Sequence, residues 1–182
     1  MTDENITAPE RDRPRKRYGS SKFKKKVKSS RKGYGKNCRQ GEYEVVNKSK
    51  YKGTKTTIRY LSSYELAVFK FMDASPHVIE WSAETIIVPY FNPVKNRKAR
   101  YIVDIYVKFK DRHGNIHTEL CEVKPYAQAS KAPVKTARKS QKVFESEQRT
   151  WIVNQAKWQA AKKYAEDRGW NFRILTEHQI FK

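Results

Sequence analysis

Cysteine, glycine and proline are scarce in this chain, and long apolar runs are missing from it. The 182 residues include two cysteines, seven glycines and seven prolines. The cysteines, Cys38 and Cys121, show no paired ligand spacing, so they argue against a disulfide framework and indicate reduced thiols in a cytosolic compartment. No apolar run approaches the roughly 20 residues that span a bilayer. The N-terminus lacks the apolar segment of a signal peptide, so we expect neither a membrane protein nor a secreted one.

Several familiar catalytic motifs are also absent. The few glycines form no phosphate-binding loop. His113 and His117 flank a turn without cysteine or further histidine nearby, which disfavours a zinc site. No serine or cysteine has a histidine placed to activate it. Carboxylates and lysines remain as the candidate catalytic groups.

Acidic residues are few compared with basic ones. Forty lysines and arginines face 19 aspartates and glutamates, a formal net charge of +21. Such an excess predicts a polyanionic partner, with nucleic acid favoured over a membrane surface. The sequence therefore points to a protein that binds DNA or RNA.

Much of the positive charge lies in residues 1–42, which hold hardly any aliphatic side chains. We predict a disordered or extended basic arm there, followed by one domain over residues 43–182. The arm could bind DNA through phosphate contacts without sequence preference. A solubilising or localisation tail, and an arm that folds against another protein, are the alternatives. The candidate DNA-binding residues of the arm are Arg15, Lys16, Arg17, Lys24, Lys25 and Lys26.

A predicted hairpin carries the main candidate site. Two β-rich runs, residues 101–109 and 116–123, flank the turn-forming Asp-Arg-His-Gly-Asn of residues 111–115. Each run has one carboxylate among apolar neighbours, Asp104 in the first and Glu122 in the second. If the hairpin is symmetric about the middle of its turn, these two carboxylates lie directly opposite each other.

Opposed carboxylates need a compensating charge, because like charges across strands destabilise a hairpin. A hard divalent cation held between carboxylate oxygens would supply it. Side chains alternate along a strand, so Glu122 and Lys124 project to the same side. A metal ion and a lysine together can activate water and stabilise charge on a reacting phosphate. The alternative is a hairpin edge whose charges point to solvent.

Helical patterns precede and follow this hairpin. Ser62 and Glu65 have capping-box spacing, which predicts a helix over residues 63–72. Glu65 stands at the N-terminal end of the buried face, where it could serve as a cap or in the site. A second helix is predicted over residues 145–168, and we expect its tryptophan-rich stripe to be core. Lys157 on this helix is a candidate phosphate contact.

The remaining segments complete a predicted fold. Residues 84–90 form a β-branched run and the first long strand, residues 92–100 a basic loop, and residues 170–175 a last short strand. The order is helix, three-stranded antiparallel meander, helix and strand, in the α/β (α+β) class. Residues 126–142 are predicted as a mobile loop that either reaches a phosphate backbone or is only solvated. Its candidate DNA contacts are Lys131, Lys135, Arg138 and Lys139.

Five short motifs occur in chain order: Ser62-Ser-Tyr-Glu65, Trp81-x-x-Glu84, Arg100-Tyr-Ile-Val-Asp104, Cys121-Glu-Val-Lys-Pro125 and Arg173-Ile-Leu-Thr-Glu177. As a set, these motifs resemble the PD-(D/E)XK nuclease superfamily, particularly its transposon-type and tailed-phage endonucleases. One departure is Val103, which stands where the superfamily usually has proline. The lead-in Asn47-Lys-Ser-Lys-Tyr-Lys-Gly53 is similar to that of the head completion nucleases of T4-like phages.

This resemblance implies a restriction-endonuclease-like core and specific roles. Asp104 and Glu122 would be metal ligands, Glu65 would complete the metal site, Lys124 would position or activate the water, and Lys157 would contact phosphate. The implied protein is a DNA endonuclease dependent on Mg²⁺, with Mn²⁺ as a substitute. It would process packaged DNA during phage head completion before tail joining, in the virion or the host cytoplasm, with DNA and portal or neck proteins as partners. The alternatives are a non-catalytic basic DNA-binding virion protein and a repair or recombination nuclease of the same fold.

Overall fold

A computed structural model describes residues 40–181 of the chain. The six basic residues chosen in the predicted arm lie outside the described residues. The elements in chain order are β1 (Gly41–Glu44), β2 (Thr57–Tyr60), α1 (Ser63–Ala74), β3 (Val78–Ala83), β4 (Ile87–Asn92), β5 (Arg97–Ile102), β6 (Ile105–Lys110), β7 (Ile116–Val123), α2 (Tyr126–Ala129), α3 (Gln141–Glu166), β8 (Asn171–Leu175) and α4 (Glu177–Ile180).

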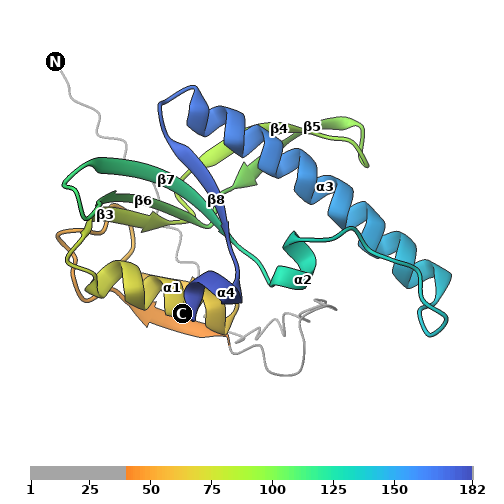
Figure 1. Ribbon diagram of the computed structural model, residues 1–182, viewed down its shortest axis with the longest axis horizontal. Coiled ribbons are helices and arrows are strands. Elements are labelled where there is room, and N and C mark those ends of the chain that lie inside the picture. The colour runs from red at the N-terminus through yellow and green to blue at the C-terminus, as the bar shows by residue number, and fades with distance from the viewer. Residues whose placement is uncertain (1–39, 182) are drawn as a thin grey trace, which may run out of the picture. The chain divides into compact units, whose positions relative to one another are not determined.

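A four-stranded mixed sheet forms the centre of this part of the chain, in the order β3-β6-β7-β8 (Figure 1). The first three strands pair antiparallel, whereas β8 runs parallel to β7. A parallel neighbour requires a crossover connection, which α3 supplies. The predicted α/β class with a mixed sheet is therefore confirmed, but β4 and β5 intervene between β3 and β6, so the three antiparallel strands are not consecutive in the chain as predicted.

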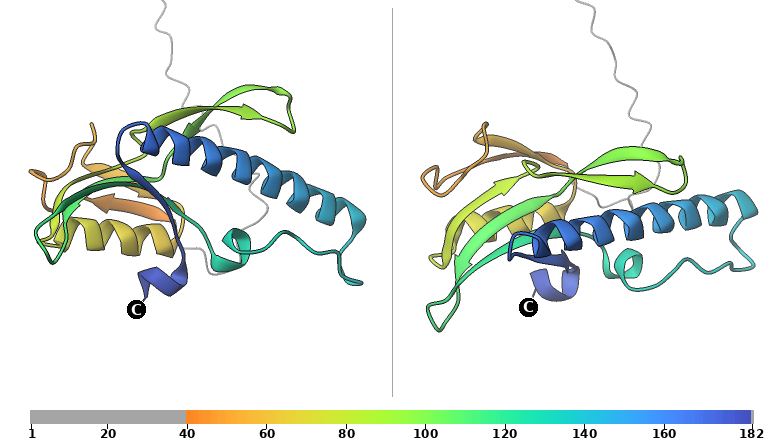
Figure 2. Two further views of the ribbon diagram at one scale, coloured as in Figure 1. Left: turned by 45° about the horizontal axis from the view of Figure 1, so that its top comes forward. Right: turned by 90° about the horizontal axis from the view of Figure 1, so that it is seen from above.

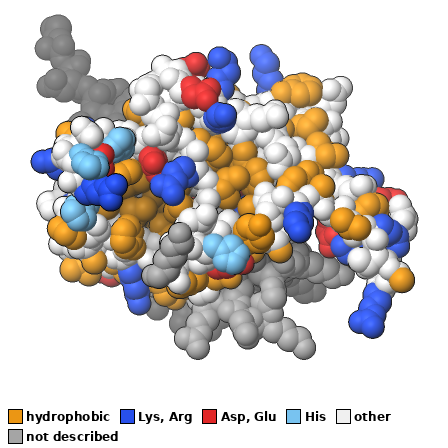
Figure 3. Space-filling model, viewed as in Figure 1, with side chains coloured by type: hydrophobic (Ala, Val, Ile, Leu, Met, Phe, Trp, Pro, Cys, Tyr) orange, Lys and Arg blue, Asp and Glu red, His pale blue; other side chains and the backbone are white. Residues whose placement is uncertain are grey.

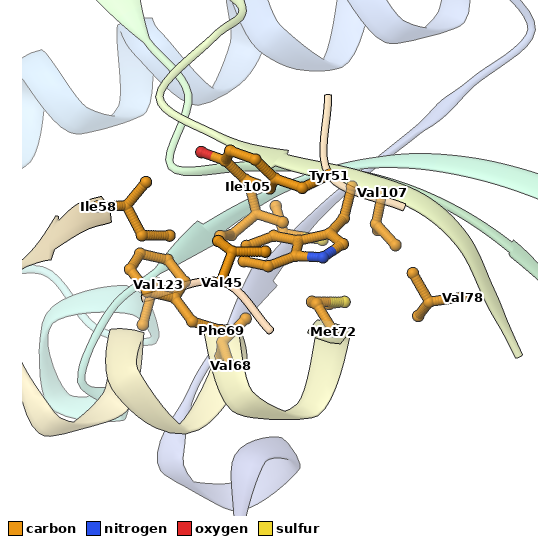
Figure 4. Packing of buried hydrophobic residues seen from close by; sticks show 12 residues of the cluster. Val45, Tyr51, Ile58, Val68, Phe69, Met72, Val78, Ile105, Val107 and Val123 are labelled. Atoms are coloured by element: carbon orange, nitrogen blue, oxygen red, sulfur yellow. The ribbon is translucent and has the colours of Figure 1, made fainter. Parts of the chain in front are cut away.

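The two faces of the sheet bury different cores, because alternate residues of a strand point to opposite faces. Ile105 and Val123 pack with Phe69 of α1 and with Trp81, which is completely buried. Figure 4 shows side chains of α1 and the sheet meeting in this core. On the other face, Leu120 packs with buried alanines of α3 in a second core. The sheet is thus held between α1 and α3.

The first strand of the meander differs from the prediction. It is β3, whereas most of the predicted strand at residues 84–90 belongs to β4, which pairs with β5 in a separate two-stranded sheet. Glu84 separates β3 from β4 with a φ of 53°, a left-handed conformation that interrupts a strand. The predicted basic loop at residues 92–100 is wrong in its second half, because β5 begins at Arg97.

The predicted strand at residues 101–109 is also divided, since β5 ends at Ile102 and β6 begins at Ile105. The chain leaves one sheet and enters another at Val103 and Asp104. At this junction the Val103 amide donates to the Ile86 carbonyl (3.0 Å), and the Glu84 amide donates to the Asp104 carbonyl (3.0 Å). These backbone bonds fix the hairpin β4–β5 to the start of β6.

Helix α3 begins earlier than predicted. Ser140 caps it by accepting a hydrogen bond from the Val143 amide (3.3 Å), so the last two residues of the predicted loop, 141 and 142, are helix. The rest of the predicted loop includes the short helix α2. The buried residues of α3 are Trp158, Ala161 and Ala165, which confirms that this part of the tryptophan-rich stripe is core. No helix within residues 40–181 is long and apolar enough to cross a membrane.

Asp73, at the end of α1, anchors the segment that precedes β2. Its buried carboxylate accepts hydrogen bonds from the Tyr43 hydroxyl (2.7 Å) and the amides of Val46 (2.7 Å) and Asn47 (2.9 Å). Burial alone would raise the pKa of the Asp73 carboxyl, but these hydrogen bonds outweigh it and hold the pKa below its usual value. A carboxylate at this position therefore stabilises the fold.

Candidate active site

Asp104 lies at the break between β5 and β6, opposite Glu122 of β7. The register pairs Ile105 with Cys121, so the predicted symmetry of the β6–β7 hairpin is confirmed. The Oδ2 atom of Asp104 accepts a hydrogen bond from the Val123 amide (2.8 Å). Asp104 is thereby fixed against the strand that carries Glu122.

Glu122 is buried, with 4% of its surface exposed, and both of its oxygens have partners. Oε1 forms an ion pair with Lys124 Nζ (2.8 Å), and Oε2 accepts a hydrogen bond from the Tyr101 hydroxyl (2.5 Å). The side chains of Glu122 and Lys124 project to the same side of β7, as predicted. The Glu122 carboxylate is directed into the protein rather than toward solvent.

Electrostatics couple Asp104 to its neighbours. Burial raises the pKa of the Asp104 carboxyl to about 8, and the negative charge of Glu122 adds to this rise. The Lys124 ammonium opposes the rise without cancelling it. Burial and the Glu122 carboxylate likewise raise the pKa of the Tyr101 hydroxyl, so Tyr101 acts as a hydrogen-bond donor. Two acids in a poorly hydrated place favour a bound cation.

Glu65 lies in the first turn of α1, where its backbone and side chain both take part in capping the helix. Its amide donates to the Ser62 hydroxyl (3.1 Å), while its own carboxylate accepts from the Leu61 amide (2.7 Å) and the Ser62 hydroxyl (3.1 Å). Burial raises the pKa of the Glu65 carboxyl, and Lys124 partly offsets this. The Glu65 charge also raises the pKa of Asp104, so α1 brings a third acid within electrostatic range of the pair.

The donor set suits a hard divalent ion, because Asp104 and Glu122 offer carboxylate oxygens. Within residues 40–181, however, no three Asp, Glu, His or Cys side chains gather closely enough to hold a metal ion. Asp104 and Glu122, which the β6–β7 register brings opposite each other, are the candidate ligands. Glu65 would have to release a capping hydrogen bond before it could join them.

Tyr101 of β5 and Lys157 of α3 lie next to the acid pair. Tyr101, 3% exposed, donates the hydrogen bond to Glu122, and Lys157 of α3 lies over its ring with Nζ 5.4 Å from the centroid. The sequence prediction missed Tyr101. Its position three residues before Asp104 could have marked it as a neighbour of the candidate site. Lys157 was predicted as a phosphate contact, and the structure places it next to Tyr101.

Three of the four predicted basic contacts after α2 are exposed, and the fourth is held in an ion pair. Lys131, Lys135 and Arg138 are exposed, whereas Lys139 is ion-paired with Glu147 (2.6 Å). Apart from the candidate site, a cavity of about 440 Å³ opens between α1 and the sheet. Figure 3 shows hydrophobic side chains at the surface between β7 and α1. Glu65, Asp104, Glu122 and Lys124 do not line this cavity.

Comparison with known proteins identifies the family of this chain. The model of the family described as "TnsA-like endonuclease N terminal" matches residues 75–177. The chain belongs to this family. The TnsA-like match includes Asp104, Glu122, Lys124 and Lys157 and excludes Glu65. The head completion nuclease of Enterobacteria phage T4 is 40% identical to this TnsA-like chain over 140 residues, which are 75% of the chain and 90% of that protein. The expected superfamily is confirmed, and the TnsA-like protein is an endonuclease.

Proposed function

We propose that this endonuclease hydrolyses DNA phosphodiester bonds with Mg²⁺ or Mn²⁺, using Asp104 and Glu122 as metal ligands. The observation that carries the proposal is the buried pair of acids next to Lys124. A metal ion held there by Asp104 and Glu122 would lower the pKa of a water molecule and offset charge on the scissile phosphate. Burial and the nearby Glu122 charge raise the pKa of Asp104, and a bound cation would offset both effects.

Lys124 is proposed to act on the phosphate or the attacking water. Its ammonium group lies 2.8 Å from Glu122 Oε1, and 17% of its side chain is exposed. From that position it can donate a hydrogen bond to a phosphate oxygen while Glu122 keeps it oriented. Lys157, over the Tyr101 ring, is proposed to contact the DNA backbone from α3. Lys131, Lys135, Arg138 and Lys139 are proposed as weaker backbone contacts, as are the basic residues of the arm.

Glu65 is proposed to complete the coordination shell once DNA and metal are bound. Its capping hydrogen bonds from Leu61 and Ser62 keep it at the N-terminus of α1. The interaction of the Glu65 carboxylate with the ion would offset the free energy lost with one of these hydrogen bonds. This step is separable from the cap role, because glutamine retains an oxygen for the cap.

The biological setting is proposed from the relative in phage T4. That protein is named a head completion nuclease, and its similarity extends over 90% of its length. We infer that this endonuclease also acts in phage head completion, on packaged DNA before tail joining, in the virion or the host cytoplasm. Portal or neck proteins are the proposed protein partners.

The test is plasmid nicking with Mg²⁺, Mn²⁺ or chelator by purified variants. Asp104→Asn and Glu122→Gln should lose metal-dependent nicking while salt-sensitive DNA binding persists. Glu166→Gln is the matched control. Glu166 is an exposed acid of α3 whose ion pair with Lys162 is long, at 3.8 Å, so its replacement removes one carboxylate charge away from the candidate site. Nicking by Asp104→Asn at the rate of the unchanged protein would refute the assignment. Supercoiled, linear and branched DNA assayed together would define the substrate.

A further inference from the structure

The β4–β5 hairpin extends beyond the central sheet and leaves one of its faces uncovered. Figure 2 shows it lying along α3, away from the central strands. Its inner face carries Val88, Tyr90 and Tyr101, which are buried in the core shared with α3. Since alternate residues point the other way, the rest of the hairpin forms an outer face.

That outer face combines apolar and basic side chains. The cross-strand pairs on it are Ile87 with Ile102, Pro89 with Arg100, and Phe91 with Lys98. Phe91 is 55% exposed, and Ile87 and Ile102 are about half exposed. Lys95 in the turn is also exposed, as is Arg97, which begins β5 opposite Asn92, and no acidic residue occurs in residues 85–103.

Hydrogen bonds also fix the hairpin at its tip and at its base. At the tip, Asn92 Oδ1 accepts hydrogen bonds from the amides of Val94 (3.1 Å) and Lys95 (2.9 Å), a local arrangement that preforms a turn. At the base, Tyr101 is hydrogen-bonded to Glu122, and the chain continues directly into Asp104. Anything that binds the outer face is therefore connected to the acid pair through a short, ordered segment.

We propose that the outer face of β4–β5 binds duplex DNA beside the scissile phosphate. This inference rests on the proposed function, which it extends by naming a DNA-contacting surface. A two-stranded ribbon fits a groove of DNA, Lys98 and Arg100 supply phosphate contacts, and Phe91 supplies an apolar contact to bases or sugars. DNA is favoured over a protein partner because the hairpin carries four basic residues, no acid, and a direct connection to Asp104.

The size of the hairpin sets a measurable footprint. A six-residue strand extends roughly 20 Å, at about 3.4 Å per residue. Base pairs are stacked about 3.4 Å apart along each strand of DNA. The hairpin should therefore protect about six base pairs on one side of the cleavage position.

The experiment measures duplex binding by the full chain in chelator, where no cleavage interferes. Lys98→Ala/Arg100→Ala should weaken binding at least tenfold at moderate salt and reduce the slope of log Kd against log salt by about 2. Phe91→Ala should weaken binding without changing that slope. Lys110→Ala/Arg112→Ala is the matched control: it removes the same charges at and just beyond the far end of β6, where Lys110 is roughly 20 Å along the strand from Asp104. Thermal unfolding checks that each variant is folded.

The outcomes separate this proposal from the nuclease assignment. Equal salt slopes for the hairpin variant and the control would overturn the hairpin proposal and favour a protein partner on this face, even if Asp104→Asn abolishes nicking. A slope reduced only in the hairpin variant supports it, even if the protein does not nick DNA. Hydroxyl-radical footprints that lose about six protected base pairs with Lys98→Ala/Arg100→Ala would support it independently.

Discussion

Replacement of Tyr101 by phenylalanine should weaken metal binding without disturbing the core. The change removes only the hydroxyl that donates to Glu122 Oε2, and the ring keeps its buried position on α3. A hydrogen bond to a charged acceptor contributes about 1.5–3 kcal/mol, and Lys124 still neutralises the other oxygen. We therefore expect the free energy of unfolding to fall by about 1–2 kcal/mol. A residue that orients a metal ligand typically affects metal affinity or activity by about 10–100-fold.

The assay is single-turnover plasmid nicking over a Mg²⁺ titration, with urea unfolding in parallel. For Tyr101→Phe the Mg²⁺ concentration that gives half-maximal rate should rise by about 10–100-fold. Tyr106→Phe is the control, because its hydroxyl also donates to a carboxylate, that of Glu80 (2.7 Å), away from the acid pair. An unchanged Mg²⁺ requirement for Tyr101→Phe, or an equal shift in Tyr106→Phe, would refute the positioning role.

Three further predictions concern the acids. Asp73→Asn should lower the free energy of unfolding by about 2–4 kcal/mol at pH 7. Because the native pKa of Asp73 is lowered, this stabilisation exists above the ordinary aspartate pKa of about 3.9 and is lost as pH falls below it, so urea unfolding at pH 3 should show a smaller deficit. Glu65→Gln should retain the stability of the unchanged protein but lose nicking, whereas Glu65→Ala should lose both; full nicking by Glu65→Gln would limit Glu65 to its cap. Because a raised pKa leaves Asp104 protonated below about 8, Mg²⁺ should raise the unfolding temperature more at pH 8.5 than at pH 6.5, and Asp104→Asn should remove that difference.

The local chemistry of the sequence was enough to predict the acid pair. The turn at residues 111–115 fixes the register of β6 and β7, and with it the placement of Asp104 opposite Glu122. The N-cap contact between the Ser62 hydroxyl and the Glu65 amide likewise depends only on spacing within one turn. Both features are set by residues close together in the chain, so pattern alone suffices.

Strand pairings and side-chain contacts that depend on tertiary packing could not be predicted from local sequence patterns. The run at residues 84–90 is richer in β-branched residues than residues 78–83, yet β3 rather than β4 pairs with β6. The choice depends on Trp81, which fills the core against α1 and cannot be recognised as central from sequence periodicity. The role of Tyr101 was missed for a related reason: the continuous run Ile-Val-Asp-Ile conceals the break after Ile102 that lets Tyr101 reach Glu122.

Val103, the departure from the superfamily pattern, has a structural explanation at this break. Its amide donates to the Ile86 carbonyl (3.0 Å), and its side chain is buried. Proline suits the extended backbone of Ile102 before it, but it has no N–H to donate, and the Ile86 carbonyl would lose its partner. Val103→Pro should therefore lower the free energy of unfolding by about 1–3 kcal/mol. Val103→Ala, which keeps the amide, separates this loss from the loss of packing. If urea unfolding shows Val103→Pro to be as stable as the unchanged protein, the hydrogen bond to Ile86 does not hold β4–β5 against Asp104.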